Sequence, residues 1–205
     1  MESSTDDGDT TERLAKAIAA IDAANADDPF TLVLDGIERP KELLHAELMT
    51  EWVQRLDPAA TPEQLIAARA HHLRRWALPR EDYPEGRAGY LRWRTTLKRR
   101  HAEEVGTILE GVGYGPESIE RVQRIVRKEG LGRDPQVQVH EDALCLVFLQ
   151  TQLDDVAGQL GDEKSVDVLR KTARKMSEQG LAAAAELPYS PTGRRLLEAA
   201  LADDT

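Results

Sequence analysis

Apolar residues recur with the 3.6-residue period of an α-helix along most of this 205-residue chain. At 40% apolar residues, a chain of this length can bury a substantial core. The sequence therefore predicts an all-α fold, a single-domain helical bundle. The periodic segments span residues 11–25, 41–56, 62–77, 87–113, 116–129, 135–160, 163–177 and 191–202.

Cap residues, prolines and glycines mark the ends of these segments. Thr61 and Ser190 each precede a proline, which places a capping side chain before a proline at the first helical position. Gly113, Gly130 and Gly161 follow periodic segments, where glycine commonly ends a helix. These signals predict helices that begin at residues 62 and 191 and end before the three glycines.

Two regions fall outside the helical pattern. Residues 30–34 (Phe-Thr-Leu-Val-Leu) are typical of a strand but have no obvious partner, so we expect an extended surface segment. Residues 1–10 are polar and acidic, which predicts a disordered tail. The predicted organisation is this tail, a helical domain over residues 11–190, and a C-terminal helix with an acidic end over residues 191–205.

Composition and charge exclude several classes of protein. The sequence has no apolar run long enough to span a bilayer and no signal peptide, which predicts a cytoplasmic protein without a membrane partner. The single cysteine, Cys145, lies among apolar residues and is expected to pack as a small hydrophobe. The net charge is −10, and the six basic residues between Arg87 and Arg100 are spread around their helix, which disfavours nucleic-acid binding.

Several polar side chains fall on the apolar faces of the predicted helices. A buried imidazole without a partner costs about 1–3 kcal/mol and a buried carboxylate costs more, so these groups are expected to satisfy one another or share an ion. Imidazole and carboxylate ligands suit a divalent metal such as manganese, cobalt, zinc or iron. The residues on apolar faces are His45, Arg69, His71, His72, Arg94, His101 and Asp142, with Lys98 at the margin.

Four segments carry a resemblance to a known family. They are residues 39–45 (RPKELLH), 68–76 (ARAHHLRRW), 87–94 (RAGYLRWR) and 141–149 (EDALCLVFL). Together they resemble the DUF4202 family over about residues 13 to 190. That resemblance brings no established activity.

A more distant similarity concerns the order of the metal-binding residue types. His45, then His71-His72, then Asp142 resembles the H…HD…D order of HD-domain phosphohydrolases, which are helical metal enzymes. The resemblance implies that His45, His71, His72 and Asp142 bind the metal. Because His72 replaces the aspartate of the HD pair, we expect one ion, held by His45, His71 or His72, and Asp142.

These residues lead to three hypotheses. The first is a metal-dependent phosphohydrolase acting on a small phosphate ester or nucleotide, with Glu104 as general base. The second is a non-catalytic sensor that keeps an anion- or nucleotide-binding pocket and has a degenerate HD site. The third is an iron-dependent oxygenase of the HD type. In the first, the substrate-binding residues are Arg69, Arg94, Lys98, His101 and Lys128, with Arg127 beside Lys128.

Overall fold

The computed structural model describes residues 6–34 and 36–202, and it is mostly helical. No helix in these ranges combines the length and the apolar character needed to cross a membrane. The chain divides into two compact units, residues 1–130 (unit 1) and residues 131–205 (unit 2). This differs from the single bundle over residues 11–190, because a helical period does not tell which helices pack together.

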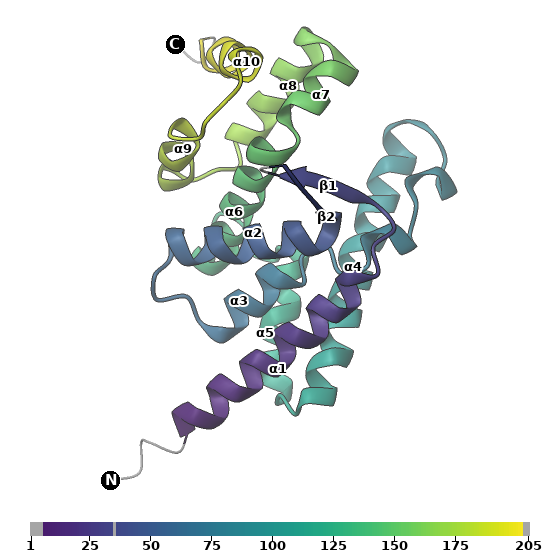
Figure 1. The fold of residues 1–205 in the computed structure, drawn as a ribbon, viewed down its shortest axis with the longest axis vertical. Helices are drawn as coiled ribbons and strands as arrows, with labels where there is room; N and C mark the ends of the chain where they lie inside the picture. Colours follow the sequence, from purple (N-terminus) through teal and green to yellow (C-terminus); the bar gives the residue numbers. More distant parts are fainter. Residues whose placement is uncertain (1–5, 35, 203–205) are drawn as a thin grey trace. The chain divides into compact units, whose positions relative to one another are not determined.

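Unit 1 is a group of helices with one small hairpin (Figure 1). Helix α3 packs on α1, α2 and α5, while α4 packs on α1 and α5. The side chains buried among them include Ile21, Met49, Val53, Ile66, Leu73, Val105, Leu109 and Ile125. The elements are α1 (Asp6–Ala26), β1 (Thr31–Leu34), β2 (Ile37–Pro40), α2 (Lys41–Leu56), α3 (Pro62–Arg69), 3-10 turns at Arg75–Ala77 and Arg80–Asp82, α4 (Gly86–Val112) and α5 (Pro116–Arg127).

Two sequence predictions at the start of the chain need correction. Helix α1 begins at Asp6, so it covers half of the stretch predicted to be disordered, and residues 1–5 lie outside the described residues. The predicted strand does have a partner, because β1 pairs antiparallel with β2 in a register that sets Leu34 opposite Ile37. The sequence of β2, Ile-Glu-Arg-Pro, does not predict a strand, because it lacks the apolar alternation typical of one.

The predicted helix over residues 62–77 stops early, at Arg69. Its start is the predicted one, with Thr61 and Gln64 forming a reciprocal capping box. Beyond it, Arg74 adopts a left-handed conformation at φ 49°, and its backbone N–H donates to Asn25 Oδ1 on α1 at 3.1 Å. This contact to another helix holds a turn in place of a helix, so His71 and His72 lie in the turn.

Unit 2 contains five helices among its described residues (Figure 1). The predicted helix over 135–160 is two helices, because the backbone breaks at Gln152. Helix α9 was not predicted, although Ser177 caps it by accepting a hydrogen bond from Gly180 N–H at 3.1 Å. Cys145 is buried, as expected. The elements are α6 (Pro135–Thr151), α7 (Leu153–Leu160), α8 (Asp162–Ala173), α9 (Glu178–Ala185) and α10 (Pro191–Leu201).

The end signals at Ser190, Gly113 and Gly161 are confirmed, whereas α5 ends at Arg127 with Lys128 as its cap and so stops short of Gly130. Ser190 caps α10 by accepting from Gly193 N–H at 3.0 Å. Gly113 ends α4 in the left-handed conformation at φ 88°, and Gly161 follows α7 at φ 76°. Glycine adopts these positive φ values without the steric cost of a side chain.

Candidate metal centre

Glu42 and His45 stand one turn apart on α2 and point to the same side. The first turn of this helix is fixed from outside, because Asp28 Oδ2 accepts a hydrogen bond from Glu42 N–H at 2.9 Å. Residues three apart on a helix are neighbours on its surface. The Glu42 carboxylate therefore lies beside the His45 ring, with Oε2 at 3.5 Å from His45 Nδ1.

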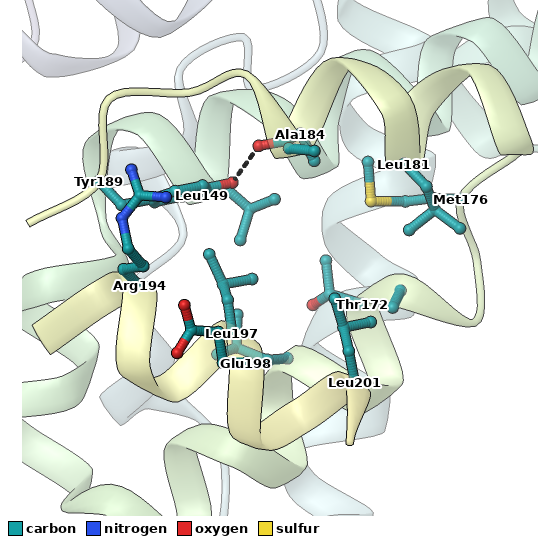
Figure 2. A pocket seen from close by; sticks show the side chains of 13 residues that line it. Leu149, Thr172, Met176, Leu181, Ala184, Tyr189, Arg194, Leu197, Glu198 and Leu201 are labelled. Carbon is teal, nitrogen blue, oxygen red and sulfur yellow. Dashed lines mark hydrogen bonds between the residues drawn. The ribbon is translucent and has the colours of Figure 1, made fainter. Parts of the chain in front are cut away.

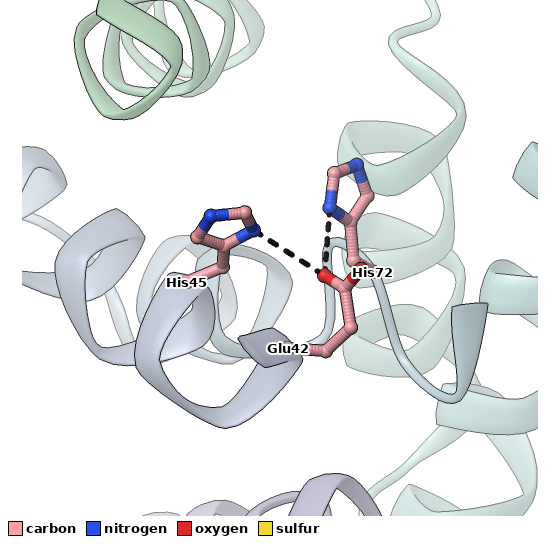
Figure 3. A group of neighbouring side chains, drawn as sticks. All are labelled: Glu42, His45 and His72. Carbon is pink, nitrogen blue, oxygen red and sulfur yellow. Dashed lines mark hydrogen bonds and ion pairs between the residues drawn. The ribbon is translucent and has the colours of Figure 1, made fainter. Parts of the chain in front are cut away.

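His72 completes the cluster from the turn after α3. Its Nδ1 lies 3.0 Å from Glu42 Oε2, so both imidazoles face one carboxylate oxygen (Figure 3). One ligand atom from each of Glu42, His45 and His72 lies within 4.8 Å of the other two. We refer to these three residues as the Glu42 cluster.

The Glu42 cluster is withdrawn from solvent. The side chains of Glu42 and His45 are 5% and 3% exposed, while His72 is 20% exposed. Burial raises the pKa of the Glu42 carboxyl, but the charge and hydrogen bonds of His72 and His45 outweigh it and hold that pKa well below its usual range. Burial lowers the pKa of His72 to about 4, although Glu42 opposes the shift. At neutral pH the cluster therefore offers an ionised carboxylate beside a neutral His72 imidazole, which are the protonation states that metal ligands need.

Two further histidines of unit 1 surround His72. Its ring centroid lies 4.3 Å from that of His71 and 6.0 Å from that of His101 on α4. His101 Nε2 is buried and has no hydrogen-bond partner in the described structure. Burial lowers the pKa of His101 to about 3, so this ring is neutral at pH 7. An unpaired, neutral imidazole nitrogen can accept a proton, a hydrogen bond or a metal ion.

Arg75 places a positive charge next to the cluster. One of its terminal nitrogens lies 4.0 Å from Glu42 Oε1, and its guanidinium stacks 5.2 Å from the centre of the Trp93 ring. Its side chain is 29% exposed. A guanidinium held in this way can bind a phosphate or carboxylate that approaches from solvent.

The predicted metal ligands are only partly those of the cluster. His45 and His72 belong to the Glu42 cluster. His71 packs beside His72 but is not a member of the cluster. Glu42 was not predicted. Its position three residues before His45, toward the same side of the helix, is the signal that could have found it.

Asp142, the fourth predicted ligand, belongs to unit 2, where it holds the start of α9. Its Oδ1 accepts from Ser177 N–H at 2.9 Å and from the Gln138 amide at 3.0 Å, and its Oδ2 accepts from the Ser177 hydroxyl at 2.6 Å. Gly180 leaves the room, since a Cβ there would lie 2.7 Å from Asp142 Cγ. Its partners within unit 2 satisfy this carboxylate, so we assign Asp142 a structural role.

Asp142→Asn is expected to destabilise the protein by about 1–2 kcal/mol. The amide nitrogen of asparagine is itself a donor, and it would face donors that now form hydrogen bonds to the carboxylate. Thermal denaturation measures this loss. Asp155→Asn is the matched control, since Asp155 is exposed on α7. Equal stability of the two variants would show that the Asp142 contacts contribute nothing.

Most of the predicted substrate-binding residues have partners of their own. Arg69 donates to both carboxylate oxygens of Asp22, at 2.5 and 2.7 Å, and lies 3.7 Å from Glu47, so it ties helices together and is not free for phosphate. Arg94 stacks on the Tyr90 ring at 5.7 Å. Lys98 is half-buried on α4, one turn before His101, and Lys128 ends α5 in the left-handed conformation.

Glu104, the predicted general base, lies on α4 one turn after His101. Its Oε1 accepts from Arg100 Nε at 2.6 Å, while its Oε2 is buried without a partner in the described structure. Arg127 is paired with Glu129 at 2.7 Å and with Glu120 at 3.2 Å, which gives it a local structural role.

Comparison with known proteins gives one family. Residues 15–197 match the family described as "Domain of unknown function (DUF4202)". Neither the curated proteins nor the solved structures contain a match to this chain.

Proposed function

Because the chain belongs to the DUF4202 family, whose description assigns no activity, we propose a function from the site alone. We propose that the protein is a phosphohydrolase that uses one divalent metal ion, held by Glu42, His45 and His72. Its substrate is a small phosphate ester or a nucleotide.

The observation that carries this proposal is the meeting of two imidazoles and one carboxylate within 4.8 Å. Two histidines and one glutamate form the ligand set of several hydrolytic zinc enzymes, in which the remaining position holds water or substrate. A metal ion bound there would lower the pKa of a water and polarise a phosphoryl oxygen. Burial of Glu42 and His45 favours one fixed ligand arrangement.

Arg75 beside the cluster, and charged residues on the helix that carries His101, suit a phosphorylated substrate. Arg75, next to Glu42 and partly exposed, would bind the phosphate oxygens. Arg94 and Lys98 lie on the helix that carries His101 and would add positive charge. Glu104 Oε2 and His101 Nε2, neither of which has a hydrogen-bond partner among the described residues, are the candidate proton acceptors.

The relationship to HD-domain enzymes belongs to this proposal. It is supported by the helical fold and by the chain order, with His45 on α2, the His71-His72 pair after α3 and His101 on α4. In the arrangement that we propose, Glu42 supplies the carboxylate in place of Asp142.

The same ligand set also supports the oxygenase hypothesis. Two histidines and one carboxylate with open positions form the iron site of non-haem iron(II) oxygenases. The identity of the metal therefore separates two chemistries. Oxygen consumption that requires iron would select the oxygenase, whereas release of phosphate would select the hydrolase.

The test begins with the metal content of the full chain, purified without a histidine tag and measured by elemental mass spectrometry. We expect close to one ion per chain after reconstitution with manganese, cobalt, zinc or iron. The loaded protein is then assayed for phosphate release from p-nitrophenyl phosphate and from nucleoside mono-, di- and triphosphates. Phosphate release that disappears with a chelator and returns with the metal supports the proposal.

Two outcomes contradict it. If no metal binds after reconstitution, the cluster is not a metal site. If no metal binds but nucleotides bind tightly, the second hypothesis, a non-catalytic sensor, replaces the enzyme.

A further inference from the structure

Unit 2 contains a cavity that has no part in the proposed function. Its volume is about 370 Å³, and it lies among α8, α9, α10 and the end of α6 (Figure 2). Cavities of 300–1,000 Å³ are typical of sites for small molecules. The lining residues are mostly aliphatic, among them Leu149, Leu169, Met176, Leu181, Leu197 and Leu201.

The two hydroxyl groups in the wall are already engaged with the backbone. Tyr189 donates to the Ala184 carbonyl oxygen at 2.7 Å, and Thr172 Oγ1 donates to the Val168 carbonyl oxygen at 2.9 Å. Burial raises the pKa of the Tyr189 phenol to about 12, in keeping with apolar surroundings. The wall therefore presents mainly hydrocarbon surface and few hydrogen-bonding groups to a ligand. Such a surface suits an apolar ligand.

Large apolar side chains also border the cavity where it opens to solvent. Leu181 is 38% exposed and Leu201 is 58% exposed, although both line the cavity. Exposed apolar side chains next to an apolar cavity mark a binding site more often than isolated ones do. Met176, whose flexible thioether adapts to different shapes, also lines the cavity and lies beside Leu181 in Figure 2.

One positive and one negative side chain belong to the same wall. Arg194 and Glu198 both line the cavity from α10, and neither makes an ion pair within the described part of the chain. Arg194 lines the same cavity as Tyr189, and its guanidinium lowers the pKa of the Tyr189 phenol against the larger effect of burial. Figure 2 shows Arg194 next to Tyr189, at one side of the cavity.

We propose that this cavity binds a medium-chain carboxylate, with an alkyl chain of about ten carbons inside and its carboxylate on Arg194. The size supports this chain length, because a closed apolar cavity of about 150 Å³ holds one benzene molecule and this one is more than twice as large. The alkyl chain of the ligand would make dispersion contacts with the aliphatic side chains that line the cavity. The carboxylate would give Arg194 a charge partner.

The experiment is isothermal titration calorimetry of the full chain with sodium decanoate below its micellar concentration. We expect saturable binding of one molecule per chain. Hexanoate should bind at least about tenfold more weakly, because it buries four fewer methylene groups. Absence of saturable binding, or equal binding of the two carboxylates, would overturn the proposal.

Variants locate the bound molecule. Ala184→Phe fills the cavity and should abolish binding, whereas Ala182→Phe, on the exposed side of the same helix, should not. If Ala184→Phe fails to fold by circular dichroism, Leu181→Glu tests the same wall from an exposed position. Binding that survives in the folded wall variant contradicts the site.

The charge is tested separately. Arg194→Gln should weaken decanoate binding about tenfold. Arg195→Gln is the matched control, because Arg195 is next in sequence, lies outside the lining and is paired with Asp162 at 2.7 Å. Equal affinities of the two variants would rule out Arg194 as the carboxylate-binding residue. The calorimetry uses metal-free protein, so its outcome is independent of the proposed hydrolase.

Discussion

Glu42→Gln is expected to lower the affinity of the protein for zinc at least about 100-fold. Glutamine keeps the length of the side chain but removes the negative charge that the two imidazoles face at 3.0 and 3.5 Å. Substitution of groups that only orient a ligand already costs 10–100-fold in metal affinity, so loss of a ligand should cost at least as much. Competition with a chromophoric chelator measures the affinity.

The histidines of the cluster give the same test from two other positions. His45→Gln and His72→Gln should each weaken zinc binding to a similar degree. Glu51→Gln is the matched control, because Glu51 lies on the same helix as Glu42 and is exposed. Asp142→Asn should lose stability but keep the affinity for zinc. If Glu42→Gln binds zinc as tightly as the wild type, the Glu42 cluster is not a metal site and the proposed function is wrong.

The metal-free protein is expected to lose at least about 2 kcal/mol of stability between pH 7 and pH 5. His101 has its pKa lowered to about 3 by burial, so the folded protein resists its protonation across this range. An unfolded histidine has a pKa near 6.5 and takes up the proton. The unfolded state therefore binds more protons as the pH falls below about 6.5, and stability declines by up to about 1.4 kcal/mol per pH unit for each such histidine.

His72 adds to this loss, since its pKa of about 4 is also below the unfolded value. Its contribution is smaller than that of His101, because its side chain is 20% exposed and therefore better solvated. Glu42 acts in a lower window. Its pKa is lowered in the folded state, so the stability that it contributes is lost only as the pH falls below the usual range of a glutamate. Measurements between pH 7 and pH 5 therefore isolate the histidines.

Urea denaturation at pH 7, 6 and 5 tests this expectation, with His101→Leu for comparison. Leucine is apolar and does not titrate, so the variant should lose about 2 kcal/mol less than the wild type over the same range. Parallel stability profiles of the two proteins would mean that His101 is protonated in the folded state. Zinc should raise the stability of the wild type most at pH 7 and so steepen its profile, because a bound ion stabilises the folded protein and protons compete with the ion for its ligands as the pH falls.

Local patterns in the sequence determined most of the helices. The bounds of α2 agree with the predicted residues 41–56, and α5 begins at the predicted residue. The caps at Thr61 and Ser190 need only a side chain and a backbone N–H three residues later, which the sequence itself supplies. Helix α9 lacks the periodic alternation of apolar and polar residues that marks the other helices, because it is rich in alanine.

Local patterns also identified two of the three residues in the Glu42 cluster. His45 and His72 are polar groups among apolar neighbours, and such a contrast is visible in a sequence. Glu42 did not stand out from its neighbours in this way, because an acidic residue is common in the first turn of a helix. Asp142 gave a strong contrast, but its partners, Gln138 and Ser177, were not predicted to meet.

The sequence by itself thus determined where most helices start and which polar groups must be satisfied inside. Only the tertiary structure decided which groups satisfy one another. The turn that presents His72 to Glu42 depends on a hydrogen bond from Arg74 to Asn25, nearly fifty residues away in the chain. A periodic pattern predicts which residues share one face of a helix. The Glu42 cluster forms between separate elements, and no local rule predicts which side chains meet there.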